Sequence, residues 1–240
     1  MLTRLISLAA ALCLLAGSTL VVADEAAVRK AFTARFPKAQ VQSVTKLPVL
    51  NLYEIVVDGE VLYADEKFEY LVDGSIIAIK TMTNLTDQRK RKLSAISFDE
   101  LPLDLAFKKV KGNGERKLAV FSDPDCPFCR RVENDLAKLD NVTIYMFLYP
   151  IESLHPNAPT VSKRIWCSPD KVKAWDDYML RGTQPGLNAD CTNPVDKIVE
   201  FGRKRAITGT PTLVFPSGER VPGAIPAAQI ENYLNGTNVN

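Results

Sequence analysis

The chain has 240 residues, of which 46% are hydrophobic and 24% charged, and its formal net charge is +2. This balance is typical of a folded globular protein and argues against a strongly basic nucleic-acid-binding surface or a charged disordered tail. At this length the chain can form one large domain or two small ones.

The first residues have the features of a secretory signal peptide. A single Arg4 precedes an apolar run from Leu5 to Leu15, and Val21-Val22-Ala23 ends the segment with residues that suit a signal peptidase. We therefore predict that residues 1–23 are removed on export. A membrane anchor is the alternative, and the short apolar run disfavours it.

Residues 24–84 have the pattern of a small α+β domain. Helical spacing covers 24–36, and a period of two then predicts strands at 41–46, 52–57, 60–64, 68–72 and 75–81, with turns at Asp58-Gly59 and Asp73-Gly74. So short a segment makes a thin core, and small domains often complete their burial against a partner. We predict a homodimer through this domain, most simply by an exposed strand edge; a monomeric domain is the alternative.

Residues 85–97 are predicted to form a linker helix with Thr86 as its N-cap. The run Arg89-Lys90-Arg91-Lys92 could indicate a nucleic-acid patch. Asp87 lies beside it, however, and a short charged helix of this kind more often has a solvated face. No nucleic-acid partner is predicted.

Residues 98–240 alternate between strands and helices. Ser97 and Glu100 have the spacing of a capping box for a short helix, and Gly112-Asn113-Gly114 is typical of a hairpin turn. The pattern predicts strands at 106–111, 116–121, 142–149, 209–215 and 220–222, and helices at 128–139, 158–166, 171–181, 194–205 and 226–234. Ser168-Pro169 is expected to cap the helix at 171–181. The strands on either side of helix 128–139 are expected to form a βαβ unit.

The motif Cys126-Pro127-Phe128-Cys129 lies where a buried strand passes into a helix. Unpaired N–H groups and the positive end of the dipole at a helix start favour negative charge, so Cys126 is predicted to ionise readily and act as a nucleophile. Cys129 is expected to be more shielded and close enough to form a disulfide with Cys126. A zinc site is the alternative, but the chain has no second Cys-x-x-Cys pair. We predict redox chemistry, with no metal or cofactor.

Cys167 and Cys191 are the remaining cysteines of the exported chain, because Cys13 leaves with the signal peptide. An even number of cysteines in an oxidising compartment favours a structural disulfide between these two. A buried pair of free thiols is the alternative.

The order of these elements resembles the thioredoxin fold. The thiol motif at a strand-to-helix junction is followed, much further along the chain, by Gly209-Thr210-Pro211 at the start of a strand. The resemblance implies a cis bond between Thr210 and Pro211 that packs against the active-site sulfurs. It also implies that the Thr210 backbone binds an extended substrate peptide.

The exported chain as a whole looks like the DsbC/DsbG family of disulfide isomerases. The features that carry this resemblance are the domain order, the motif at 123–129, Ile165-Trp166-Cys167 and Gly209-Thr210-Pro211. It implies a periplasmic, V-shaped homodimer with a cystatin-like N-terminal dimerisation domain and an α/β thioredoxin-fold catalytic domain with a helical insertion. It further implies a Cys167–Cys191 structural disulfide and a membrane thiol reductant of the DsbD type that keeps the active site reduced.

The predicted activity is thiol–disulfide exchange on misfolded or oxidised exported proteins. Cys126 attacks a wrong disulfide, and the mixed disulfide is either shuffled by the substrate or resolved by Cys129. Three alternatives stay open: a DsbG-type reductase of single oxidised cysteines, a non-catalytic holdase chaperone, and a DsbA-like oxidase.

Two positions near the motif bear on proton transfer. Val120 stands where thioredoxins carry a buried acid, so Cys129 would exchange its proton through water, Asp123 or Asp125, although both acids also suit turn or cap positions. The only histidine, His155, lies in a predicted loop, and a Cys-His hydrolase would need it beside Cys126.

Overall fold

The computed structural model describes residues 19–237, which form two compact units divided between Leu93 and Ser94. The predicted signal peptide lies outside the described residues except for 19–23, which belong to the first helix, α1 (Thr19–Arg35). Within the described part of the chain, no helix is long and apolar enough to cross a membrane.

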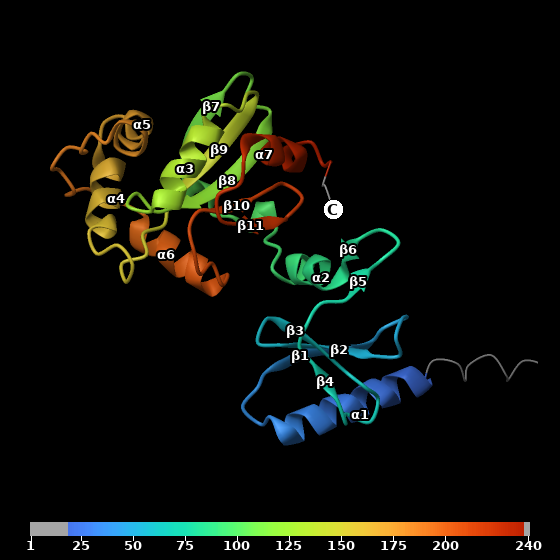
Figure 1. Cartoon of the computed structure of the whole chain (residues 1–240). Helices are drawn as coiled ribbons and strands as arrows, with labels where there is room; N and C mark the ends of the chain where they lie inside the picture. Colours follow the sequence, from blue (N-terminus) through green and yellow to red (C-terminus); the bar gives the residue numbers. More distant parts are fainter. Residues whose placement is uncertain (1–18, 238–240) are drawn as a thin grey trace, which may run out of the picture. The chain divides into compact units, whose positions relative to one another are not determined.

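The N-terminal unit is a helix packed on a four-stranded antiparallel sheet (Figure 1). α1 buries Val28 and Phe32 in the same cluster as Tyr53 and Ile55 of the sheet. The predicted turn at Asp58-Gly59 is confirmed, because both residues have positive φ, 51° and 82°, as a two-residue hairpin requires. The strands, in their order across the sheet, are β1 (Val41–Lys46), β2 (Tyr53–Val57), β3 (Glu60–Ala64) and β4 (Leu71–Val72).

The end of this sheet differs from the prediction. The predicted strand at 68–72 is shortened to β4, because the Asp65 carboxylate accepts hydrogen bonds from three N–H groups within 67–70 and curls the chain into a turn. The single strand predicted at 75–81 is also wrong. Two short strands that pair with each other replace it, β5 (Ile77–Ala78) and β6 (Thr83–Asn84).

Helix α2 (Leu85–Leu93) covers only the first part of the predicted linker helix, and its N-cap differs from the prediction. Asn84 Oδ1 accepts the Asp87 N–H at 3.0 Å and so caps the helix. Thr86 is instead buried, with its hydroxyl 2.5 Å from the hydroxyl of Tyr63. The basic residues of α2 pair with acids of the sheet, Arg89 with Glu54 and Lys90 with Glu60.

The C-terminal unit is built on a five-stranded sheet in the order β11-β10-β8-β9-β7 (Figure 1). Two short 3-10 helices precede it, and Ser97 makes no side-chain cap hydrogen bond, so the predicted capping box does not form. The elements are η1 (Phe98–Glu100), η2 (Leu103–Leu105), β7 (Phe107–Lys111), β8 (Arg116–Ser122), α3 (Pro127–Leu136), β9 (Val142–Leu148), α4 (Ala158–Cys167), α5 (Lys171–Arg181), α6 (Val195–Lys204), β10 (Thr212–Val214), β11 (Arg220–Pro222) and α7 (Ala227–Leu234).

The pairing of β7 corrects one prediction. β8, α3 and β9 form the expected βαβ unit with parallel strands. β7 does not form a hairpin with β8, because β9 lies between them and pairs antiparallel with β7. Gly112 permits this route: its φ is 56°, and a Cβ there would lie 2.3 Å from Asn141 Oδ1. The chain therefore passes close to the start of β9 before it enters β8.

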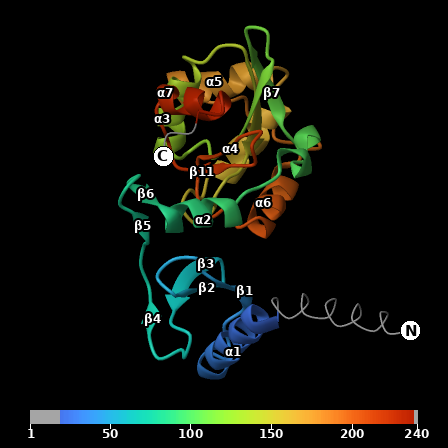
Figure 2. The same ribbon diagram turned by 90° about the vertical axis from the view of Figure 1, so that its right-hand side faces the viewer.

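Helices cover both faces of this sheet (Figure 2). One face packs against α3, α5 and α7, which bury Leu136, Trp175 and Ile230. The other face packs against α6 and η1, which bury Ile198 and Phe98. The start of α3 consequently lies at the carboxyl end of the central strand β8, in a frame that is packed from both sides.

Candidate active site

Cys126 lies at the start of α3, just after the loop that follows β8. It is the N-cap residue, and Pro127 takes an opening helical position, where its missing N–H has no partner to lose. The first N–H groups of a helix lack intrahelical acceptors and carry the positive end of the dipole. The structure thus places this sulfur in a field that favours negative charge.

The pKa of the Cys126 thiol falls from its ordinary value of 9.0 to about 5. The largest cause is a hydrogen bond from the Cys129 thiol; burial opposes it, and the backbone N–H groups of Cys129 and Phe128 and the side chain of Thr210 lower the pKa further. Cys126 keeps 5% of its surface exposed. Because the thiolate is the attacking form of a cysteine, the lowered pKa favours the form of Cys126 that can act as a nucleophile at neutral pH.

Cys129 lies one turn deeper in α3 and is fully buried. Burial raises the pKa of its thiol, and the neighbouring Cys126 raises it further. The Ser122 hydroxyl and the Asp123 N–H, which is 3.4 Å from Cys129 Sγ, act in the opposite direction without reversing the shift. The two free thiols are therefore unequal: Cys126 is buried but keeps a small exposed surface and a lowered pKa, whereas Cys129 is fully buried and its pKa is raised.

Thr210 and Pro211 lie beside Cys126. The peptide bond between them is cis, as the resemblance to thioredoxin implies, and the Thr210 carbonyl oxygen is 3.4 Å from Cys126 Sγ. β10 follows directly and pairs with β8, and the Pro211 carbonyl accepts the Gly223 N–H at 2.7 Å. Sheet pairing thus holds this segment against the start of α3.

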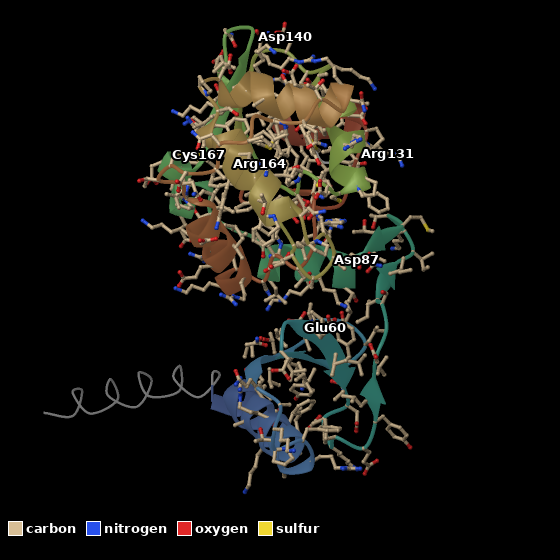
Figure 3. The ribbon with its side chains drawn as sticks, turned by 90° about the vertical axis from the view of Figure 1, so that its left-hand side faces the viewer. Glu60, Asp87, Arg131, Asp140, Arg164 and Cys167 are labelled. Atoms are coloured by element: carbon tan, nitrogen blue, oxygen red, sulfur yellow. A yellow bond between two sulfur atoms is a disulfide. The ribbon has the colours of Figure 1, made fainter. Side chains whose placement is uncertain are left out.

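Cys167 and Cys191 form a disulfide with a Cα–Cα distance of 5.8 Å. In Figure 3, Cys167 at the end of α4 lies well apart from Arg131 of the thiol-bearing helix α3. The bond links the end of α4 to the segment before α6 and encloses α5 in the loop between them. It also occupies both sulfurs, so a four-cysteine zinc site does not fit this arrangement.

The two acids before Cys126 act as loop residues. Asp123 is fully buried; its Oδ1 accepts the Asp125 N–H at 2.8 Å, and its carbonyl accepts the Cys126 N–H at 3.2 Å. Asp125 Oδ1 accepts a hydrogen bond from the Tyr178 hydroxyl of α5 at 2.5 Å. Among the described residues, no hydrogen bond joins either carboxylate to Cys129. Of the two roles considered for these acids, the geometry favours that of turn residues.

Sequence reasoning missed two partners of this loop, Tyr178 and His155. His155 lies in the loop between β9 and α4, as predicted, but its Nδ1 is 3.0 Å from Asp123 Oδ2. These contacts join residues 53 and 32 positions apart, so no local spacing could indicate them. The one available signal was that the chain contains a single histidine.

Two protein families match the two units of the chain. Residues 19–87 match the family described as the disulfide bond isomerase protein N-terminal domain, and residues 103–238 match the thioredoxin-like domain. The second match corresponds to the sheet and helices that carry the thiols, Thr210 and Pro211.

Individual relatives agree with these matches. The probable thiol:disulfide interchange protein DsbC of Bordetella pertussis is 42% identical over 208 residues, which cover 87% of this chain and 73% of that protein. The thiol:disulfide interchange protein DsbC of Escherichia coli K12 is 24% identical over 216 residues, covering 89% of this chain and 88% of that protein. The crystal structure of a disulfide interchange protein from Neisseria gonorrhoeae has a TM-score of 0.55 and 46% identity, covering 57% of this chain and 97% of that chain.

Proposed function

The chain belongs to the DsbC family of thiol:disulfide interchange proteins, and from that membership we propose that it is a periplasmic enzyme that isomerises and reduces incorrect disulfides in exported proteins. One observation carries the proposal. The Cys126 thiol, whose pKa is lowered to about 5, lies at the start of α3 beside the Thr210 carbonyl, while its partner Cys129 is fully buried. This arrangement suits an enzyme whose Cys126 is kept reduced and attacks the substrate as a thiolate.

The first step is attack by the Cys126 thiolate on one sulfur of a substrate disulfide. A bond forms between Cys126 Sγ and that sulfur, the substrate S–S bond breaks, and the other substrate sulfur leaves as a thiolate. In isomerisation, the freed thiolate attacks another disulfide of the same substrate. A later substrate thiolate then attacks the mixed disulfide and releases Cys126 as a thiolate, with no net oxidation or reduction.

Reduction instead requires Cys129. Its thiol loses a proton and attacks Cys126 Sγ, which forms the Cys126–Cys129 disulfide and releases a reduced substrate carrying both electrons. The raised pKa of Cys129 disfavours this step, because burial keeps the thiol protonated. Slow resolution gives the mixed disulfide time to shuffle, so the same burial that shields Cys129 favours isomerisation over reduction.

The substrate peptide is proposed to bind at Thr210 and Pro211. The backbone of Thr210, next to Cys126 Sγ, would pair with an extended chain in the manner of an added strand. Phe128 follows Cys126 by two positions and is 60% exposed, which gives an apolar contact for an unfolded segment. A carboxylate or metal ligand is not required for this mode of binding.

The proposed setting is the periplasm, with a homodimer formed through the N-terminal domain. The predicted signal peptide and the Cys167–Cys191 disulfide both support an oxidising compartment. β4 is an edge strand of the N-terminal sheet, with Leu71 and Val72 exposed, and offers an unpaired edge for a second copy. A membrane thiol reductant of the DsbD type is proposed to return the Cys126–Cys129 disulfide to the dithiol.

Refolding of scrambled ribonuclease tests the proposal. Cys126→Ala is expected to reduce the recovery of ribonuclease activity to the uncatalysed level, because no thiolate remains to attack. Cys129→Ala is expected to retain part of the isomerase activity, because shuffling needs only Cys126. Equal recovery with the wild-type protein and Cys126→Ala would reject the proposal.

Two rival functions give different results in matched assays. A DsbG-type reductase would turn over a sulfenylated folded protein faster than scrambled ribonuclease. A holdase chaperone would suppress aggregation equally well after both thiols of α3 are replaced by alanine. A DsbA-like oxidase is separated by trapping thiols in intact cells with a mass-tagged alkylator, since it predicts that Cys126 and Cys129 are mainly oxidised.

A further inference from the structure

A buried carboxylate is paired with an imidazole beside the thiols. The Asp123 side chain has no exposed surface, and its Oδ2 accepts the Ile151 N–H at 2.7 Å and lies 3.0 Å from His155 Nδ1. The His155 side chain is 22% exposed, so water reaches the imidazole on one side. A buried carboxylate is costly unless its charge is compensated, and His155 is the basic group that the structure places against it.

Asp123 also ties this pair to both cysteines through its backbone. Its carbonyl accepts the Cys126 N–H at 3.2 Å, and its own N–H points to Cys129 Sγ at 3.4 Å. The peptide units of Asp123 therefore fix the imidazole relative to the two sulfurs. No hydrogen bond between His155 and either sulfur occurs in the described residues, so direct proton transfer from the imidazole is not indicated.

The titratable groups that act on His155 are negative. Its pKa is raised, first by the hydrogen bond to Asp123, against the effect of burial, and then by the charges of Asp123, Cys126 and Asp125. Asp123 lies in the loop after β8, and Cys126 lies at the start of α3. Asp125 accepts a hydrogen bond from Tyr178 of α5. Because coupling between two sites is reciprocal, a thiolate that favours a protonated imidazole is itself favoured by that imidazole.

We propose that His155, paired with Asp123, is a positively charged positioning residue that stabilises the Cys126 thiolate and makes thiol exchange depend on the protonation of one imidazole. The proposal rests on the proposed function, because it concerns the same nucleophile. It assigns His155 neither the role of a general base nor that of a hydrolase partner. Loss of the proton from His155 would leave the Asp123 charge uncompensated beside the sulfur and so disfavour the thiolate.

A nuclear magnetic resonance titration of the tag-free, full-length protein tests the coupling. His155 is the only histidine of the chain, so a single imidazole signal reports its pKa without assignment. In the reduced wild-type protein the signal is expected to titrate above the ordinary His value of about 6.5. In Cys126→Ala, and in the wild-type protein with Cys126 and Cys129 oxidised to a disulfide, the midpoint is expected to shift to lower pH because the thiolate is absent. Equal midpoints in the three samples would overturn the proposal.

A second experiment measures the effect of His155 on the ionisation of Cys126. His155→Asn keeps an amide donor near Asp123 Oδ2 but removes the positive charge, so the absorbance of the Cys126 thiolate at 240 nm is expected to appear at higher pH than in the wild-type protein. An unchanged midpoint would contradict the proposal. His155→Asn and wild type are compared by circular dichroism, so that a folding defect is recognised.

These measurements do not depend on isomerase activity. If scrambled ribonuclease is not refolded by the wild-type protein but the His155 midpoint still responds to Cys126, the proposed function fails and the coupling stands. If refolding occurs but the midpoint does not respond, the coupling alone fails.

Discussion

Cys126 and Cys129 are three positions apart and remain free thiols, whereas Cys167 and Cys191 are 24 positions apart and form a disulfide. Both pairs belong to the C-terminal unit. The first lies at the start of a helix, where a hydrogen bond from Cys129 and backbone N–H groups stabilise one thiolate. The second closes a loop around α5, with Cys167 at the end of α4 and Cys191 in the segment before α6. The contrast shows that the surroundings of a cysteine pair decide whether it reacts or only constrains the chain.

Helix α3, which carries the free thiols, and helix α5, which the disulfide loop encloses, are joined by a cluster of charged side chains. Lys109 of β7 contacts Glu133 of α3 at 2.7 Å and Asp176 of α5 at 2.6 Å. The Glu133 side chain has no exposed surface. Burial lowers the pKa of Lys109, but the two carboxylates outweigh burial and raise it, so the lysine stays charged.

Replacing this lysine is expected to have the largest effect on stability. Lys109→Met leaves Glu133 buried without its partner, which typically costs about 3 to 5 kcal/mol of unfolding free energy. Lys138→Met is the matched control, because Lys138 pairs with Asp135 of the same helix at 2.9 Å but is 65% exposed. Its loss is expected to cost less than about 1 kcal/mol. Urea unfolding measures both, and equal losses would show that burial does not set the strength of this link.

The structural disulfide ranks next. The double variant Cys167→Ala/Cys191→Ala is expected to lose about 3 kcal/mol of unfolding free energy, because the unfolded chain regains the freedom of the closed loop. The pKa of Cys126 is expected to stay unchanged, since the groups that lower it most lie in α3 and at Thr210, and His155 also lies outside the loop that the disulfide closes. Thermal unfolding measures the loss of stability, and the absorbance of the thiolate at 240 nm measures the pKa of Cys126. A changed pH midpoint of the Cys126 thiolate would show that the disulfide influences the free thiols.

Expressed per pH unit, the expected effect of pH on stability is the smallest of the three. The Cys126 thiol titrates at about 5 in the folded chain and at about 9.0 when unperturbed, so its ionisation stabilises the reduced fold fully above pH 9 and not at all well below pH 5. The pKa of Cys129 is raised, so its contribution is constant over pH 5 to 8. The unfolding free energy of the reduced protein relative to Cys126→Ala should therefore rise with pH, by at most about 1.4 kcal/mol per pH unit. A difference that falls or stays flat between pH 5 and 8 would contradict this sign.

The sequence predicted the features that depend on neighbouring residues and missed those that depend on contacts between distant parts of the chain. The βαβ unit, the position of Cys126 and the turn at Asp58-Gly59 depend on local periodicity and turn chemistry, and the structure agrees with those predictions. The hairpin at 112–114 was wrong because the true partner of β7 is β9, a strand that comes later in the chain. The contact between Asp123 and His155 was not predicted at all, since only the fold brings the two together.

The N-cap errors have a similar cause. Thr86 has the side chain of a good cap, but it faces the sheet and bonds Tyr63, so the neighbouring Asn84 takes the capping position. For α5, Asp170 caps the helix through the Lys173 N–H, where Ser168-Pro169 had been predicted. In both helices the two candidates lie two positions apart and local propensity ranks them alike. In α2, the tertiary contact of Thr86 with Tyr63 decides between them.

The most direct test of the account is a pH titration of the thiolate absorbance at 240 nm in the fully reduced protein, with Cys126→Ala as the blank. The account predicts one sulfur with a midpoint at about pH 5 and no second thiolate up to pH 8. A midpoint near the unperturbed value of 9.0 would mean that the start of α3 does not stabilise the anion, and would contradict the central claim.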